Sequence, residues 1–467
     1  MKKTIIILLL ILAIVLTAMP FCASAAERVD FIIRGGTVVT MDGAGTIIEN
    51  GAVAVRRDRI VAVGRASEIE SKYNAGRVIE AGYRVIMPGL INTHTHVPMG
   101  MFRGIADDLV LMEWLQKYIF PAEAKNVDEQ FVRWGTRLGC LEMIEGGTTT
   151  YVDMYYFEDA IAEETSRAGM RAVLGETLLD FPAPDNKTWD AGMQYVEKFT
   201  DKWKGHPLIT PAIAPHAPYT VSTEHLKQAH ELSSRKNVPL VIHVAEDYAE
   251  VKTIQERYGA SSVAYLERIG LLDNRVIAAH MVWPTPEDIQ TLAARKVGVA
   301  HCPQSNMKLA AGAAPVPQML KAGVAVGLGT DGAASNNDLN LWEEMDTAAK
   351  LHKFVSKDPT VLNAREALEM ATIRGARAIH MDKEIGSLEP GKRADLIIVS
   401  VESPHQWPLY NVQSQLVYAT KASDVESVMI NGRMVMEDRR VTTIDADAVR
   451  RKAIEYRDRI RKSLQTK

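Results

Sequence analysis

The sequence predicts an α/β fold: a (β/α)8 barrel with a small β-sandwich domain that is built from both chain ends. Between about residues 90 and 332, eight short apolar runs alternate with helical patterns. Residues 29–86 and the text after residue 384 instead carry short β-rich runs broken by glycines and charged turns. Eight buried strands that alternate with helices indicate a barrel. The shared texture of the two flanks indicates one small domain.

The first 25 residues predict a secretory signal peptide. Lys2 and Lys3 precede a long apolar run, which the small-residue text "CASAA" follows. A basic start, an apolar stretch and an Ala-x-Ala end are typical of such a signal, and we expect cleavage after Ala25 or Ala26. The protein is therefore expected to be exported, periplasmic or extracellular, and free of the membrane after cleavage. The apolar run is also long enough for a retained membrane anchor, which is the alternative.

The rest of the chain is expected to divide into three segments. Residues 26–88 and 384–467 would supply the two parts of the small domain, the latter with a C-terminal helix, and residues 89–383 the barrel. The barrel strands are expected in "GLINTHTH", "TTTYVDMYY", "RAVLGE", "LITPAIAPHAP", "PLVIHVAE", "VIAAHMVW", "VGVAHCPQSN" and "VAVGLGTD". Helical text lies between them, as in "TPEDIQTLAARK", where Thr285 and Asp288 are placed to form a capping box.

The composition excludes several classes of protein. The net charge is −4 over 467 residues and no basic run stands out, so nothing indicates a nucleic-acid partner. Outside the predicted signal, Cys140 and Cys302 are too few for a disulfide framework. Stability must then come from a large core, which 47% hydrophobic residues can supply. A small-molecule substrate is the expected partner, and homo-oligomerisation stays open.

Histidines and acids gather at the predicted strand ends. In "INTHTH", His94 and His96 are two residues apart, so their side chains point to the same side of a strand. In barrels of this kind the working residues lie at the C-terminal ends of the strands. The other residues at such ends are His216, His243, Glu246, His280, His301 and Asp331. Their common position at one rim predicts a shared site.

A metal shell can be drawn from His94, His96, His243 and Asp331. Imidazole suits both Zn²⁺ and Fe²⁺, and a carboxylate reduces the net charge. We expect one divalent ion, with zinc favoured over iron(II), which would lower the pKa of a bound water towards about 7. Glu246 lies three residues after His243 and can accept and return a proton. His280 could polarise the reacting atom or orient the water.

Several motifs together carry a resemblance to a known family. "PGLINTHTH", "IHVAE", "AAH", "GLGTDGAASNNDLNLWEEM" and "PGKRADLIIV" resemble the amidohydrolase superfamily. Within it they look like the methylthioadenosine/S-adenosylhomocysteine deaminase branch, near the triazine hydrolases and guanine deaminases. The resemblance covers nearly the whole chain after the signal. It implies an aminohydrolase that acts on adenosine-type nucleosides and releases ammonia from purine carbon 6.

The resemblance also implies roles for residues. It implies a single metal ion, because "PAIAPHAPYT" lacks the bridging lysine or glutamate of binuclear relatives. The implied metal ligands are His94, His96, His243 and Asp331, and the implied catalytic residues are Glu246, His280 and Asp331. Glu246 would also contact the purine, to which it delivers a proton. Glu123 in "IFPAE" matches a glutamate that grips the ribose hydroxyls, and His216 in "APHAPY" matches a histidine that contacts substrate.

One position departs from the branch. Characterised relatives use an arginine after the third strand to reach the amino-acid carboxylate of the substrate, whereas this chain has Glu176 in "RAVLGET". Because two carboxylates repel each other, a neutral or cationic 5′ tail is expected. Two alternatives remain: Glu176 is only a hydrogen-bond acceptor behind the site, or a loop lysine such as Lys187 supplies the missing charge.

Two other functions stay open. The same scaffold could hydrolyse or deaminate a triazine-type or guanine-type ring, but the ribose-binding acid Glu123 would be useless to a ring without a sugar. More remotely, the chain could be a secreted binding protein with a vestigial metal site, against which the intact ligands and Glu246 argue. Of the remaining residues, His301 is expected to pack beneath the site, and Ser305 or Asn306 could contact a ligand.

Overall fold

Eight parallel strands form the barrel, and each begins within one of the eight predicted runs. This computed structural model describes residues 26–465, so the predicted signal peptide lies outside the described residues. The strands are neighbours in the order β13-β12-β11-β10-β9-β8-β7-β6. Their bounds are Leu90–Thr95 (β6), Thr148–Tyr155 (β7), Arg171–Leu178 (β8), Ile209–Pro215 (β9), Leu240–Val244 (β10), Val276–His280 (β11), Gly298–His301 (β12) and Ala325–Leu328 (β13). Strand β8 continues two residues past its run, to Leu178. The predicted barrel is confirmed.

Hydrogen bonds join the first barrel strand to the segment that follows the last. The Asn92 amide donates to the Thr330 hydroxyl at 2.8 Å and accepts from the Thr330 backbone at 3.0 Å. The Asp331 backbone N–H donates to the His94 carbonyl at 3.0 Å. This closure brings the predicted ligands at the two ends of the barrel sequence together.

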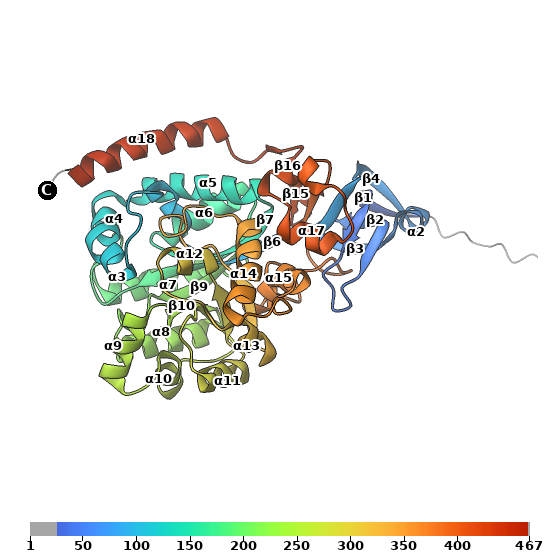
Figure 1. Ribbon diagram of the computed structural model, residues 1–467. Helices are drawn as coiled ribbons and strands as arrows, with labels where there is room; N and C mark the ends of the chain where they lie inside the picture. Colours follow the sequence, from blue (N-terminus) through green and yellow to red (C-terminus); the bar gives the residue numbers. More distant parts are fainter. Residues whose placement is uncertain (1–25, 466–467) are drawn as a thin grey trace, which may run out of the picture.

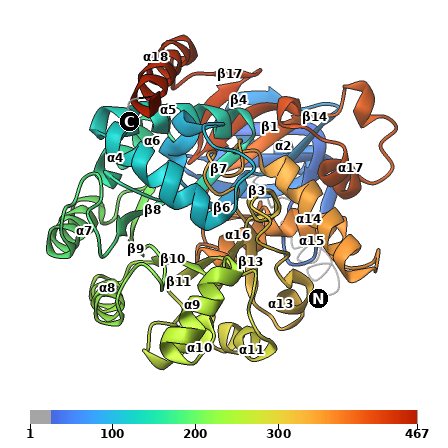
Figure 2. The same ribbon diagram turned by 60° about the vertical axis from the view of Figure 1, so that its left-hand side comes forward.

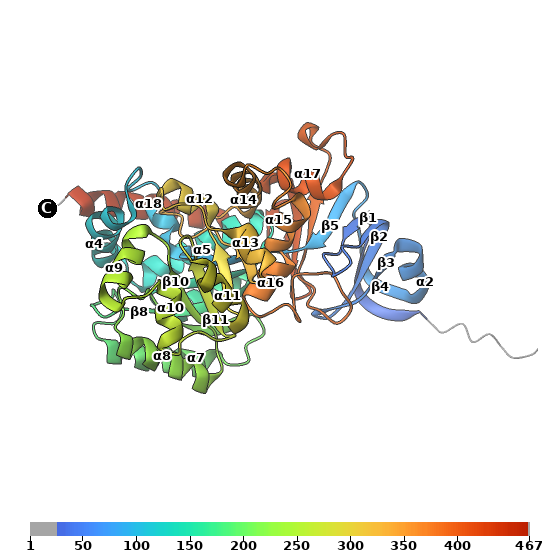
Figure 3. The same cartoon turned by 60° about the horizontal axis from the view of Figure 1, so that its bottom comes forward.

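Helices surround the strands, as Figure 2 shows. They are α5 (Glu129–Glu145), α6 (Glu158–Ala168), α7 (Trp189–Trp203), α8 (Thr223–Lys236), α9 (Tyr248–Tyr258), α10 (Ser262–Arg268), α11 (Pro286–Arg295), α12 (Pro303–Lys308), α13 (Val316–Lys321), α14 (Leu341–Ser356) and α15 (Ala364–Met370). Helix α16 (Ile373–Ala378) lies between the barrel and the small domain in Figure 3. Its residue Ala376 joins Ile91, Val152 and Val241 of the barrel interior in one buried cluster, so α16 closes the end opposite the predicted site.

A run of short helices follows β6 and lies over the C-terminal ends of the barrel strands. It consists of η1 (Val97–Phe102), α3 (Leu111–Glu113), the π-helix η2 (Trp114–Ile119) and α4 (Phe120–Asn126). Trp114, Leu115 and Ile119 of the π-helix are buried. The apolar side chains of this run form one wall of the cavity described below.

The small domain contains strands from both ends of the chain. Figure 1 shows β1–β4 beside β15 and β16, and the sheet order is β17-β16-β15-β14-β5-β1-β2-β3, with β4 paired to β1. The strands are Glu27–Val39 (β1), Ile47–Arg56 (β2), Arg59–Arg65 (β3), Tyr73–Glu80 (β4), Arg84–Pro88 (β5), Leu396–Ser400 (β14), Val425–Ile430 (β15), Arg433–Glu437 (β16) and Arg440–Val441 (β17). They form one connected mixed sheet, whose central pairing of β5 with β14 joins the two chain ends. The remaining helical elements are α2 (Ala66–Lys72), η3 (Pro404–Gln406), α17 (Val412–Tyr418), η4 (Ala422–Asp424) and α18 (Ala446–Gln465).

A buried ion pair links the small domain to the barrel. Arg171 of β8 donates to Asp395 at 2.7 Å, and both side chains are only 3% exposed. Cys140 and Cys302 are buried and unpaired, in agreement with the predicted lack of a disulfide framework. Within residues 26–465, no helix has the length and apolar character needed to cross a bilayer.

Candidate active site

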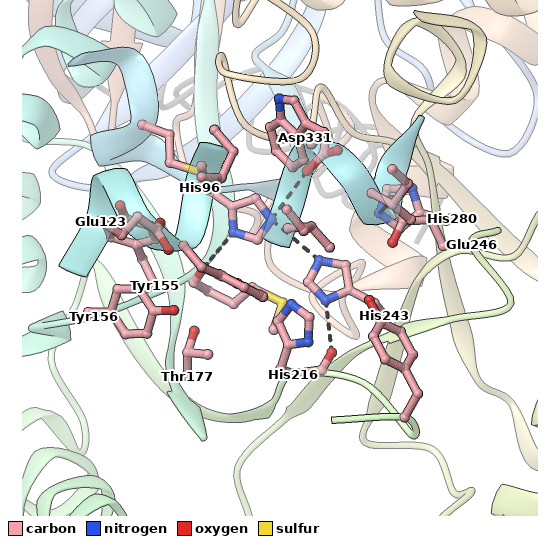
Figure 4. Close-up of a pocket in the computed structure, with 18 residues that line it drawn as sticks. His96, Glu123, Tyr155, Tyr156, Thr177, His216, His243, Glu246, His280 and Asp331 are labelled. Carbon is pink, nitrogen blue, oxygen red and sulfur yellow. Dashed lines mark hydrogen bonds and ion pairs between the residues drawn. The ribbon is translucent and has the colours of Figure 1, made fainter. Parts of the chain in front are cut away.

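Four histidines and one aspartate converge at the C-terminal ends of the barrel strands. His94 and His96 come from the end of β6, His243 from β10, His280 from β11, and Asp331 follows β13. The Nε2 atoms of His96 and His243 are 3.3 Å apart. Asp331 Oδ1 lies 3.4 Å from His94 Nε2 and 3.2 Å from His96 Nε2. Figure 4 shows His96, His243 and Asp331 turned towards one another.

Two overlapping groups in this cluster have ligand atoms close enough to hold one cation. They are His94, His96 and His243, and His94, His280 and Asp331, each within 4.8 Å of one another. The structure thus brings together the four residues predicted as ligands, with His280 beside them. His94 belongs to both groups, and its ring centroid lies 4.9 Å from those of His96 and His243 and 5.4 Å from that of His280.

The backbone beneath the cluster adopts a conformation that residues with a side chain seldom take. Ala245, His280 and Asp331 have φ angles of 52°, 72° and 63°. Such left-handed residues cost on the order of 1 kcal/mol or more each, and they gather where function demands a particular side-chain direction. The turns at three strand ends are therefore shaped to aim side chains at this rim.

Hydrogen bonds orient the histidine rings. His96 Nδ1 lies 2.6 Å from the Met154 carbonyl, and His243 Nδ1 lies 2.8 Å from the His216 carbonyl. When Nδ1–H donates to a carbonyl, a neutral ring presents its Nε2 lone pair on the other side. With both rings neutral, the two facing Nε2 lone pairs would repel each other unless a cation lay between them. Burial lowers the pKa of His96, but its hydrogen bond to Asp331 outweighs burial and raises the pKa to about 9, so an incoming cation must displace that proton.

Other ring nitrogens lack a hydrogen bond. Within residues 26–465, both ring nitrogens of His94 and Nε2 of His280 are buried without one, although the two Nε2 atoms lie 3.4 Å and 3.7 Å from the carboxyl oxygens of Asp331 and Glu246. Burial lowers the pKa of His94 to about 4 and also lowers that of His280, so both rings stay neutral. Buried polar atoms without a partner are rare in folded proteins. Neutral imidazoles beside a carboxylate fit a Zn²⁺ or Fe²⁺ ion.

Two serines fix the carboxylate of Asp331. Its Oδ2 accepts hydrogen bonds from Ser305 at 2.6 Å and Ser335 at 2.9 Å. Its Oδ1, which lies beside the histidines, accepts from the Gly332 backbone at 2.8 Å. Burial opposes ionisation, but the histidine contacts outweigh it and hold the pKa of Asp331 well below its usual range. Asn306 Oδ1 lies 3.0 Å from His280 Nδ1. Ser305 and Asn306 therefore orient site residues, and neither lines the cavity described below.

Glu246 lies next to this cluster in a different environment. Its carboxylate oxygen is 3.7 Å from His280 Nε2, and its backbone N–H donates to Glu250 at 3.0 Å. Burial, together with the nearby charges of Asp331 and Glu250, raises the pKa of Glu246 well above its usual range. A carboxyl that keeps its proton near neutral pH can act as a general acid.

The cluster forms the floor of a cavity, whose lining Figure 4 draws as sticks. The lining residues are His96, Met99, Leu111, Trp114, Leu115, Ile119, Phe120, Glu123, Met154, Tyr155, Tyr156, Thr177, His216, Tyr219, His243, Glu246, His280 and Asp331. Glu123 is 4% exposed and faces Tyr155 and Tyr156. Burial raises its pKa to about 7, against the opposing effects of Tyr155 and His96. None of these lining residues, all within the described chain, is a lysine or an arginine.

The chain is similar to known proteins over most of its length. The sequence pattern described as the amidohydrolase family matches residues 85–435. The chain belongs to the amidohydrolase family. It is 50% identical over 424 residues to a 5-methylthioadenosine/S-adenosylhomocysteine deaminase of Syntrophobacter fumaroxidans. The aligned region covers 91% of this chain and 97% of that relative.

Two solved structures are also similar to this amidohydrolase. An adenosine deaminase from Xanthomonas campestris with bound zinc is 40% identical, has a TM-score of 0.92, and covers 94% of this chain and 100% of its own. A triazine hydrolase from Arthrobacter aurescens is 25% identical, has a TM-score of 0.85, and covers 91% of this chain and 99% of its own. The barrel and its flanking sheet are thus the fold of this family.

Glu176 of this amidohydrolase does not line the cavity. Its carboxylate accepts hydrogen bonds from the Glu158 backbone at 3.0 Å and from Asn186 at 3.2 Å, and Thr177 is the lining residue of β8. Of the two interpretations of Glu176, the structure agrees with a hydrogen-bond acceptor behind the site. The Lys187 amine donates to the Ala183 carbonyl at 2.7 Å and the Pro184 carbonyl at 3.0 Å, and it does not line the cavity either.

Other predicted residues take clear positions. His216 lines the cavity, and its Nδ1 lies 2.9 Å from the Thr220 hydroxyl. His301 is fully buried and contacts His352, with 3.0 Å between their Nε2 atoms, so it packs beneath the site as expected. Tyr155 and Tyr156 were not among the predicted site residues, although they end the predicted second strand, where lining residues are expected.

Proposed function

We propose that this amidohydrolase is a metal-dependent deaminase of adenosine-type nucleosides. The observation that carries the proposal is the pairing of two buried acids in one cavity: Glu246 beside the histidine cluster and Glu123 beside Tyr155 and Tyr156. Glu246 is suited to the purine ring, and Glu123 to the sugar hydroxyls. The names of the similar deaminases support the same substrate class.

His94, His96, His243 and Asp331 would hold one divalent ion, and we propose zinc, with iron(II) as the alternative. The ion, when bound, supplies an activated water at neutral pH. The support is the convergence of these donors and the unpartnered ring nitrogens of His94. The bound zinc of the similar adenosine deaminase is consistent with this choice.

The remaining residues would position the purine and move protons. Glu246 delivers its proton to the ring nitrogen next to carbon 6, which makes that carbon more electrophilic. Water adds to carbon 6 as one of its protons passes to Asp331. Asp331 then gives that proton to the amino group, which leaves as ammonia, and the remaining hydroxyl proton returns to Glu246 as the carbonyl forms. His280, fixed by Asn306, orients the water, and His216 contacts the purine nucleoside from the opposite wall.

The sugar is the point that separates this proposal from a triazine-type or guanine-type hydrolase. A buried carboxylate such as Glu123 needs donors, and two ribose hydroxyls would supply them. A ring without a sugar would leave that carboxylate unpaired, at a cost in binding. A different residue argues against the secreted binding protein. Such a protein would not need the proton donor that Glu246 can provide.

The cavity does not supply a cation for an acidic 5′ tail. Its lining residues, all described, include no lysine or arginine, and Glu176, on which the expectation of a neutral tail rested, lies behind the wall. We therefore propose a neutral or cationic 5′ tail only for substrates whose tail ends inside this cavity. Export through a cleaved signal in residues 1–25 also remains a proposal, based on the sequence alone.

Ammonia release from a panel of adenosine, 2′-deoxyadenosine, adenine and a chloro-triazine tests the substrate class. Charge-assisted hydrogen bonds contribute about 1.5–3 kcal/mol each, so the 2′-deoxy analogue should lose at least about tenfold in kcat/KM, and adenine far more. Glu123→Ala should erase this preference while the metal content stays unchanged. Glu113→Ala, an exposed change in the neighbouring helix α3, is the matched control. Equal turnover of the triazine or adenine and adenosine would overturn the proposal.

A further inference from the structure

A second chamber adjoins the cavity that holds the predicted active site. The two share the side chains of Leu115, Phe120 and Tyr219. Beyond this boundary the second chamber is lined by Met112, Gln116, Asp180, Phe181, Thr220, Val221, Ser222, Thr253, Arg257 and Tyr258. A molecule too long for the first cavity can therefore extend past Phe120 into the second, which we call the outer chamber.

The outer chamber carries one positive and one negative side chain. Among its described lining residues, Arg257 and Asp180 are the ionic ones. Arg257 donates one hydrogen bond, at 3.4 Å, to the Tyr219 carbonyl and is otherwise exposed. Asp180 accepts from the Ser222 backbone at 2.7 Å and contacts His225 Nδ1 at 2.7 Å. Arg257 has no carboxylate partner within 4 Å in the described chain, so its charge is free for a ligand.

The route between the two chambers starts at Glu123. Phe120 precedes Glu123 by three residues in α4, and side chains three apart lie on the same face of a helix. Phe120 also lies 6.4 Å from the ring of His216, centroid to centroid. A sugar held by Glu123 therefore has the outer chamber next to it.

The boundary contains a polar atom that lacks a partner. Among residues 26–465, no group bonds the buried Tyr219 hydroxyl, and burial raises its pKa well above the usual range, so it stays a donor. Tyr219 lines both chambers. A heteroatom that crosses from one chamber to the other would give this hydroxyl an acceptor.

We propose that the outer chamber receives the 5′ substituent of the nucleoside and that Arg257 determines whether a tail with a carboxylate is accepted. The inference rests on the proposed nucleoside function. A tail that ends in an α-amino acid fits best, because its carboxylate meets Arg257 and its ammonium group meets Asp180. The apolar side chains Met112, Phe181 and Val221 suit the methylenes of such a tail. Arg257 thereby takes the role that neither Glu176 nor Lys187 fills.

The test compares three nucleosides that differ only in the 5′ tail, with metal-loaded enzyme. They are methylthioadenosine, S-adenosylhomocysteine and its analogue that lacks the carboxylate. Arg257→Gln should lower kcat/KM for S-adenosylhomocysteine by about fivefold, the upper range for an exposed ion pair. The loss should fall on KM and leave kcat almost unchanged, because the tail is remote from carbon 6. The other two substrates should not respond.

Lys252→Gln serves as the matched control. Lys252 is an exposed cation of the same helix α9 but does not line the outer chamber, so all three substrates should be unaffected. An equal loss for all substrates in Arg257→Gln, or no loss for any, would overturn the inference while leaving the deaminase proposal intact. If the wild-type protein deaminated neither adenosine nor any tailed nucleoside, the proposed function would fail, and this inference with it.

Discussion

Asp331 and Glu246 are two carboxyl groups in one cavity whose surroundings shift their pKa values in opposite directions. Histidine contacts and two serine hydroxyls stabilise the Asp331 carboxylate. Glu246 lacks such donors, and burial beside Asp331 and Glu250 favours its protonated form. A pair of carboxyls with separated pKa values is the usual arrangement of an acid and a base in catalysis. The environment of the two carboxyl groups therefore supports the proposed role of Glu246 as the proton donor.

Glu246→Gln tests this assignment. Glutamine keeps the size of the side chain but cannot relay a proton, so kcat for adenosine should fall on the order of a thousandfold, within the range of general acid–base catalysis. Elemental analysis should show unchanged metal content. Glu256→Gln, an exposed change on helix α9, should behave as wild type. Near-normal turnover of Glu246→Gln would remove Glu246 from the mechanism.

For single residues, the sequence predicted which side chains lie at the site better than it predicted where each side chain points. The histidines and acids at strand ends were identifiable because the barrel rule places strand ends at one rim. The direction of Glu176 was not, because β8 continues to Leu178, and residues one apart in a strand face opposite sides. Thr177 therefore faces the cavity while Glu176 faces Glu158 and Asn186.

Among the elements, helix α11 shows that a helix cap can be predicted from the residues next to it in the sequence. The structure has the predicted capping box: the Thr285 hydroxyl accepts from the Asp288 backbone at 3.2 Å, and Asp288 accepts from the Thr285 backbone at 2.9 Å. Such caps depend on neighbours three residues apart, so the sequence suffices to predict them. The π-helix at Trp114–Ile119 could not be predicted in this way, because its apolar residues also fit an ordinary helix.

Thr285→Ala should destabilise the protein through α11 alone. Loss of a threonine cap costs about 1 kcal/mol, and we expect a decrease in Tm on the order of 1 °C for a chain of this size. Thr291→Ala changes the same residue type on the same helix, where the hydroxyl only contacts the Glu287 carbonyl at 3.1 Å in an exposed position. A decrease in Tm as large for Thr291→Ala as for Thr285→Ala would contradict the role of the cap.

At the scale of the whole molecule, long-range pairings complete the fold. The β-rich segments at both chain ends were predictable from their sequence patterns. The pairing of β5 with β14 and the buried contact of Arg171 with Asp395 were not. No local pattern encodes which distant strand is a partner, because many β-rich runs have the same periodicity. The same limit applies to the outer chamber, whose walls come from η2, α9 and the loops after β8 and β9.

The metal site tests this long-range organisation. Its proposed ligands come from β6, β10 and the end of β13. A bound ion would therefore link strands that are far apart in the sequence.

We expect one divalent ion per chain. A chelator should lower the Tm, because an ion present at 1,000 times its Kd stabilises the folded state by about 4 kcal/mol, and added zinc should restore it. His96→Asn should lose most of the metal and become insensitive to the chelator, whereas His230→Asn, outside the site, should respond as wild type does. Two ions per chain, or a Tm that ignores metal removal, would contradict a single ion at this site.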